Sequence, residues 1–277
     1  MTTCKPVLAA ASIALVAASA AAPLEAAHAQ PARSRDPTVR TRVLGWPGGD
    51  RLFVAANADV RYVQGPNGKV VVTGPAADIE DIVVDDGVIR HDRENWNRDW
   101  WKWWRWQDWR SQPVIHIVVT APHVGVAGVS GSGHLDMGRL AQDRLELSVS
   151  GSGLADASGQ FKSLSVSVSG SGGGRLGQIS TGDLSGSISG SGWIKAAGAA
   201  NSVHLGISGS GAADMGGVAA QDVDAHLSGS GSARLSPKRS ADIAVSGSGS
   251  VHLLTEPARL NAHRFGSGAI IHPGGVS

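Results

Sequence analysis

Tryptophans and cations gather in one stretch of the chain, between Asn95 and Arg110. Seven of the nine tryptophans fall there, interleaved with basic residues. Indole rings beside cations favour a membrane interface, where the ring lies at headgroup depth and the cation meets phosphate, and they also stack on sugar faces. We therefore expect contact with a membrane surface, peptidoglycan or a glycan here. The candidate binding residues are Trp96, Trp100, Trp101, Trp103, Trp104, Arg105, Trp106 and Trp109.

The same stretch has a structural interpretation. As a helix it would place Arg98 and Arg105 on one face and four tryptophans on the other, namely Trp96, Trp100, Trp103 and Trp104. Such a segment could fold back as a lid that buries its rings on the open end of a repeat domain, because these domains need a capping element. The sequence leaves both the lid and the binding surface open.

A second candidate is a column of charged residues, three positions after each copy of a repeated Ser-Gly-Ser-Gly motif. On one outward face it would form a ladder of mixed sign, and some β-helical polysaccharide lyases use such faces to abstract a proton beside an acidic sugar. That enzymatic alternative would use Asp156, Arg175, Lys195 and Asp214. We favour a solvated ladder that pairs neighbouring charges, and assign no catalytic residue. The full column is Asp136, Asp156, Arg175, Lys195, Asp214, Arg234 and His252.

Other chemistry finds little support in the sequence. The ten histidines are scattered without metal-ligand spacing, so we expect no metal site. The Gly-x-Gly strings are followed by no crossover helix and are interpreted as turns, so no cofactor is expected. A net charge of +1 offers no electrostatic footprint for nucleic acid, and the oligomeric state is not indicated.

The elements that would position these residues follow from the repeated motif. Its seven copies begin at Ser130, Ser150, Ser169, Ser189, Ser208, Ser228 and Ser246, followed by an altered copy at Phe265. A period of about 20 residues is typical of a solenoid in which each repeat is one coil stacked on its neighbours. Eight copies in phase argue against a flexible Gly-Ser linker.

Hydrophobic alternation surrounds each motif. One and five positions before it the residues are apolar, as at Val149 and Leu145, and polar residues such as Glu146 lie between them. This period of two predicts half-buried strands. With an extended backbone through the motif, both glycines would point inward and both serines outward. We predict an all-β, right-handed parallel β-helix of 19–20 residues per coil, preceded by shorter capping strands.

The N-terminal region predicts export. Lys5, an apolar stretch over residues 6–22 and the small residues Ala27 and Ala29 are typical of a signal peptide over residues 1–29. Its removal would take away Cys4, the one cysteine. We expect a flexible linker over 30–45 and a β-helix domain over 46–277, with the tryptophan-rich insertion at 91–112 and the repeats at 125–277.

Several short motifs resemble those of a bacterial family, the putative autotransporter adhesin head GIN domain. They are Phe53 followed by Val60-Arg61-Tyr62-Val63 and Gly65, Asp86-Gly87-Val88-Ile89, Val118-Val119-Thr120-Ala121-Pro122 and the reiterated Ser-Gly-Ser-Gly turns. The resemblance covers Leu52 to the C-terminus and implies an exported β-helical protein. The chain lacks a Gly-Ile-Asn tripeptide, and the tryptophan-rich stretch is interpreted as an insertion.

The function predicted from these features is that of an exported, non-enzymatic β-solenoid. It would serve as an adhesin-like binding or structural module at the cell envelope, in the periplasm or at the cell surface, with the tryptophan-rich insertion as its contact surface. The alternative is a carbohydrate-active, polysaccharide lyase-like enzyme that uses the charged column. A third interpretation treats the stacked serines as a flat hydroxyl surface for a glycan.

Overall fold

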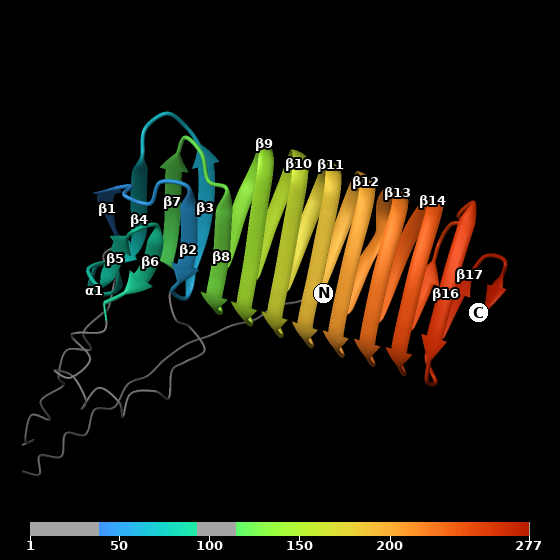
Figure 1. Cartoon of the computed structure of the whole chain (residues 1–277). Coiled ribbons are helices and arrows are strands. Elements are labelled where there is room, and N and C mark those ends of the chain that lie inside the picture. Colours follow the sequence, from blue (N-terminus) through green and yellow to red (C-terminus); the bar gives the residue numbers. More distant parts are fainter. Residues whose placement is uncertain (1–38, 93–114, 277) are drawn as a thin grey trace, which may run out of the picture. The chain divides into compact units, whose positions relative to one another are not determined.

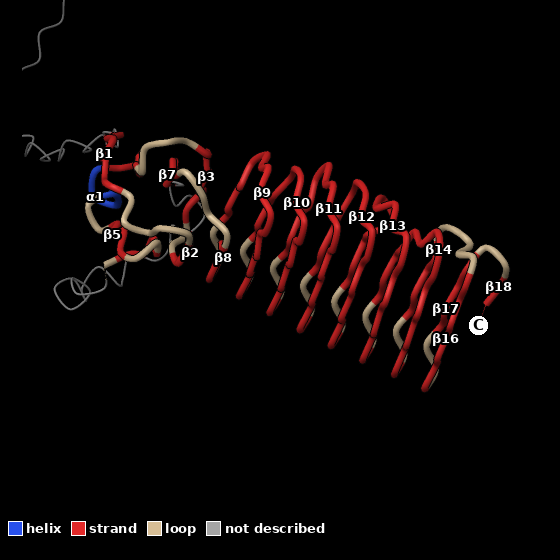
Figure 2. Tube along the Cα trace, turned by 45° about the horizontal axis from the view of Figure 1, so that its top comes forward, coloured by secondary structure: helices blue, strands red, loops and turns tan. Residues whose placement is uncertain are grey.

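The computed structural model describes residues 39–92 and 115–276, which form an all-β unit with one helical turn, α1 (Ala76–Ile79). Six long strands each make one coil, and successive coils pair in parallel (Figures 1 and 2). This confirms the predicted parallel β-helix. The coils are β9 (His134–Gly151), β10 (Leu154–Gly170), β11 (Gly173–Gly190), β12 (Trp193–Gly209), β13 (Ala212–Gly229) and β14 (Ser232–Gly247).

Each coil has two walls that meet at the Ser-Gly-Ser-Gly motif. We call the stretch after the motif wall A and the stretch before the next motif wall B. Beyond β14 the two walls separate into β15 (Ser250–Leu253) in wall A and β16 (Arg259–Phe265) in wall B. Wall A then ends with β17 (Ala269–His272), which pairs with β15 and forms an antiparallel hairpin with β18 (Gly275–Val276).

The motif makes a sharp corner rather than an extended crossing. Its first glycine is partly or fully exposed in every copy, at φ between +100° and +119°, where a side chain would be strained. Only the second glycine is buried, and a Cβ on Gly192 would lie 2.5 Å from Val168 Cγ1. The prediction that both glycines point inward is therefore wrong for the first one, because the backbone turns there.

The spacing between motifs varies through bulges in otherwise continuous strands. Two of the coils that span 19 residues have a glycine at φ +126° (Gly159) or +137° (Gly198), packed against the backbone of the coil before. A Cβ on Gly198 would lie 1.9 Å from the Ile179 oxygen. The coils that span 20 residues carry their extra residue at the register shifts, such as that between Leu176 and Ile179.

The core lies between the two walls. Wall A supplies both small and large residues, such as Ala155 and Leu135, whereas wall B supplies mostly branched residues such as Leu164, all buried. Where wall B carries Gly186, the Met215 side chain fills the space, since a Cβ there would lie 2.9 Å from Met215 Cε. Large residues facing small ones give a thin, closely packed interior.

Shorter strands extend both walls at the N-terminal end of the unit. Wall A continues through β3 (Ala58–Gln64), β7 (Ile115–Ala121), β4 (Lys69–Pro75) and β1 (Val39–Gly45). Wall B continues through β8 (Val126–Gly131), β2 (Arg51–Ala55), β6 (Val88–His91) and β5 (Ile82–Asp85). The outermost pairings are antiparallel. The predicted capping strands are therefore present.

Residues 39–45, expected in the flexible linker, form β1 instead. The strand pairs with β4 along its whole length, and the Arg42 guanidinium donates hydrogen bonds to the carbonyls of Ile79, Glu80 and Ile82. This pairing was not predicted, because the outer residues Val39 and Val43 stay exposed. No helix within the described ranges is long and apolar enough to cross a membrane.

The residues that carry the family resemblance hold this cap together. The Tyr62 hydroxyl is buried and donates a hydrogen bond to the Ala121 carbonyl at 2.9 Å, which joins β3 to β7, and burial raises the pKa of this tyrosine. Asp86 and Gly87 form the turn between β5 and β6 at φ 42° and 77°, and the Gly87 carbonyl accepts a hydrogen bond from the Phe53 amide at 2.8 Å. These motifs are therefore structural.

Candidate functional site

The charged column of wall A stacks in register. The seven residues of the column, from Asp136 to His252, are successive partners across neighbouring strands. Arg61 of β3 pairs with Asp136 and extends the column into the cap. The strand spacing therefore brings these side chains to about 4.8 Å from one coil to the next. The predicted ladder is present.

The acidic residues of the ladder are engaged by their neighbours. Asp156, whose side chain is 20% exposed, lies 3.1 Å from His134 Nε2 and 3.4 Å from the Arg175 guanidinium. Asp136 accepts a hydrogen bond from the Gly138 amide at 2.8 Å, and Asp214 lies 3.8 Å from the Lys195 ammonium. A lyase needs a base directed at its substrate, and these carboxylates are directed at the protein. The geometry does not favour the enzymatic alternative.

A histidine cluster continues this polar surface onto the cap. His134 of β9 bridges the two strands on either side of it. Its Nδ1 lies 3.1 Å from Asp59 of β3, and its Nε2 contacts Asp156 of β10. His116 Nδ1 of β7 lies 3.4 Å from the second oxygen of Asp59. Asp59 and His116 were not predicted as site residues, because they lie outside the repeat. Only the pairing of β3 with both β7 and β9 brings them to the ladder.

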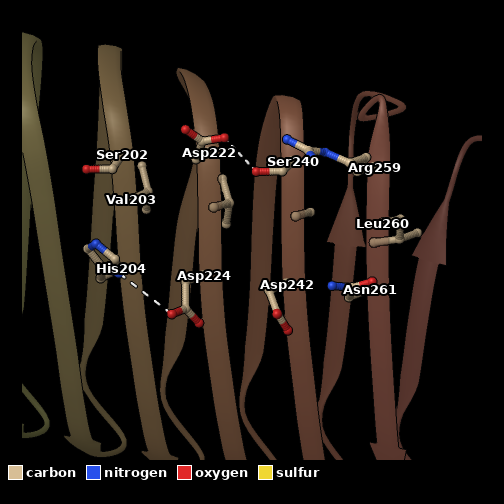
Figure 3. Close-up of a pocket in the computed structure, with 12 residues that line it drawn as sticks. Ser202, Val203, His204, Asp222, Asp224, Ser240, Asp242, Arg259, Leu260 and Asn261 are labelled. Atoms are coloured by element: carbon tan, nitrogen blue, oxygen red, sulfur yellow. Dashed lines mark hydrogen bonds and ion pairs between the residues drawn. The ribbon is translucent and has the colours of Figure 1, made fainter.

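Wall B carries a second polar surface, shown in Figure 3. An open groove of about 490 Å³ crosses its last coils. Figure 3 shows His204 directed at Asp224, with an Nδ1–Oδ2 distance of 3.8 Å, and Ser240 directed at Asp222 at 2.5 Å. The polar lining residues are Ser202, His204, Asp222, Asp224, Ser240, Asp242, Arg259 and Asn261.

Asp222 is the most perturbed acid that the structure describes. Its pKa is lowered to about 2, chiefly by hydrogen bonds from the Arg239 side chain and then by one from the Ser240 hydroxyl. The same contact raises the pKa of Arg239. Low pKa values of this origin indicate a stable ion pair and not a proton donor or acceptor near neutral pH.

The described ranges hold no group of three or more His, Cys, Asp or Glu side chains that could bind a metal ion. The predicted binding residues Trp96, Trp100, Trp101, Trp103, Trp104, Arg105, Trp106 and Trp109 lie outside the described residues. Their stretch joins β6, which belongs to wall B, to β7, which belongs to wall A. The choice between lid and binding surface therefore stays a prediction.

Comparison with known proteins places this geometry in a family. The family model described as "Putative auto-transporter adhesin, head GIN domain" matches residues 50–257, which include most of the cap and all six complete coils. The chain belongs to this family. The resemblance predicted from the cap motifs and the reiterated turns is thereby confirmed. No curated protein matches the chain in sequence.

Solved structures similar to this head GIN domain share its fold. A protein of Parabacteroides distasonis titled "putative lipid binding protein" has 21% identity and a TM-score of 0.74, over 86% of this chain and 97% of its own. A putative adhesin of Parabacteroides merdae has 18% identity and a TM-score of 0.71, over 86% and 97%. A putative adhesin of Bacteroides fragilis has 19% identity and a TM-score of 0.59, over 84% and 96%. At these identities the likeness concerns the fold alone.

Proposed function

We propose that this head GIN domain protein is an exported, non-enzymatic binding module of the adhesin type that acts at the cell envelope. The observation that carries the proposal is the engagement of the acidic side chains of the wall A ladder by neighbouring residues of the protein. Such a surface is rigid, regular and suited to recognition. The family name, the adhesin-like neighbours and the expected signal peptide at residues 1–29 support export.

The contact surface in this proposal is the tryptophan-rich stretch. Its composition supports contact with a membrane surface, peptidoglycan or a glycan. Its place in the chain adds support, because it is inserted between two cap strands, where a long segment interrupts no coil of the repeat. Insertions on a rigid scaffold are common carriers of binding.

Deletion of Asn95 to Arg110 tests this proposal. We expect the intact protein to co-sediment with liposomes or with purified peptidoglycan, and the deletion variant to lose that binding while its unfolding midpoint is retained. Phe265→Ser is the matched control, since this side chain is 70% exposed at the other end of the unit. Absence of binding by the intact protein, or equal binding by the deletion variant, would overturn the proposal.

A further inference from the structure

One tryptophan outside the tryptophan-rich stretch has an unusual setting on wall A. Trp193 is the first residue of β12 and points outward, between Gly173 of the preceding coil and Ala212 of the next. Its indole occupies the space above Gly173, where a Cβ would lie 2.3 Å from indole Cε2. The side chain stays partly exposed. Small neighbours on both sides therefore leave a large aromatic surface accessible on a rigid sheet.

This indole borders an open groove of about 320 Å³. The volume is near the lower end of the range of about 300–1,000 Å³ that ligand sites occupy. The polar lining comes from the ladder and from the column beside it: Lys195, Asp214, Ser232, Arg234 and His252. The groove thus lies over β12, β13 and β14, with β15 at its edge, and depends on the register that stacks these coils.

The groove has an excess of positive charge. Lys195 lies 3.8 Å from the one lining carboxylate, that of Asp214. The side chains of Arg234 and His252 make no hydrogen bond or ion pair with other residues within 39–92 and 115–276. The Arg234 guanidinium therefore has no partner among the described residues, and guanidinium groups bind carboxylates through paired hydrogen bonds.

The aromatic surface and the guanidinium are two strands apart, about 10 Å across the sheet. A pyranose ring has an apolar face that stacks on an indole, and hydroxyls that pair with groups such as Ser232. A carboxylate on the same or the next sugar unit would pair with Arg234. The combination matches an acidic saccharide better than a neutral one, because only the acidic one neutralises the groove.

We infer that the groove between Trp193 and Arg234 binds a uronic acid unit of a surface polysaccharide, without cleaving it. The inference goes beyond the proposed function, because it assigns a second binding surface and its ligand class at a site separate from the tryptophan-rich stretch. Arg175 offers a matched control: it stands in the same ladder, is paired with Asp156, and does not line the groove.

Isothermal titration calorimetry with a galacturonic acid hexamer tests the inference, with neutral maltohexaose for comparison. We expect the full chain to bind the acidic hexamer more tightly than the neutral one. Trp193→Ala and Arg234→Gln should each weaken the affinity for the acidic hexamer about tenfold or more. Arg175→Gln should bind as the unaltered chain does. Trp193→Phe keeps an aromatic ring and should lose less affinity for the hexamer than Trp193→Ala. The phenylalanine variant carries the test if the alanine variant fails to fold.

The inference would be overturned if the unaltered chain did not bind the hexamer. It would also be overturned if Arg234→Gln and both Trp193 variants bound the hexamer as tightly as the unaltered chain. The variant that lacks residues 95–110 separates it from the proposed function. That variant should still bind the hexamer, whatever it does with liposomes and peptidoglycan. Loss of hexamer binding in this folded deletion variant would place the saccharide site in the tryptophan-rich stretch and contradict the inference.

Discussion

The buried glycine of each corner sets a strict limit on the β-helix, and Gly192 offers the sharpest test. A Cβ at this position would lie 2.5 Å from Val168 Cγ1 and 2.7 Å from the Gly172 oxygen. That oxygen accepts the coil-to-coil hydrogen bond from the Trp193 amide at 3.0 Å, so it cannot retreat without weakening the bond. Gly192→Ala is therefore an overpacking substitution, with a cost of about 1–3 kcal/mol.

Gly206→Ala is the matched control in β12, the strand that begins directly after Gly192. A Cβ there meets nothing within 4 Å, and its φ lies outside the left-handed region. Both substitutions reduce the entropy of the unfolded chain, by about 0.4–1 kcal/mol. That term cancels between them. The difference in the free energy of unfolding between the two variants should therefore equal the overpacking term, about 2 kcal/mol.

Urea denaturation of the two variants, followed by circular dichroism, measures this difference. Because solenoids can unfold coil by coil, the slope of the transition is compared together with its midpoint. In a thermal scan the two midpoints should differ by about 4–8 °C. Equal midpoints for Gly192→Ala and Gly206→Ala would refute the close approach of the coils at the corner.

Two further predictions concern side-chain contacts. His134→Ala should destabilise the junction of β3 and β10 by about 1 kcal/mol, since partly exposed hydrogen bonds are lost, and should speed hydrogen exchange in β3. The His252 side chain has no partner within residues 39–92 and 115–276, so His252→Ala should change neither the stability nor the exchange in β3. Equal effects of the two substitutions would contradict the bridge. Asp222 has a pKa lowered to about 2 from 3.8, so its contribution is present above pH 4 and is lost between pH 4 and 2. The difference in unfolding midpoint between the unaltered chain and Asp222→Asn should shrink over that interval, and a constant difference would contradict the Arg239 contact.

The repeat made most of the fold predictable from the sequence. Residues such as Val149 and Leu145 recur at fixed positions, and parallel stacking converts each recurring position into a column. The corner was less predictable, because the same alternation fits both an extended glycine and one at positive φ. The structure distinguishes them by φ and burial, since the first glycine turns at positive φ and stays partly or fully exposed, whereas the second glycine is buried.

The site was predictable only where it follows the repeat. The ladder around Asp156 could be read from the spacing, whereas its contact with His134 depends on the column beside it. Asp59 joins the cluster through cap strands that have no period. The role of Trp193 could not be predicted for a different reason. Its exposure depends on Gly173 and Ala212, which are its neighbours across coils and lie about 20 residues away in the chain.

The central claim is that this head GIN domain protein binds an envelope component without altering it. One measurement tests both parts: co-sedimentation of the purified chain with isolated cell envelopes over a range of protein concentrations, with chemical assay of the supernatant for released reducing ends and unsaturated sugars. The account predicts saturable binding and no released product. Product that rises with protein concentration, or no co-sedimentation at all, would contradict it.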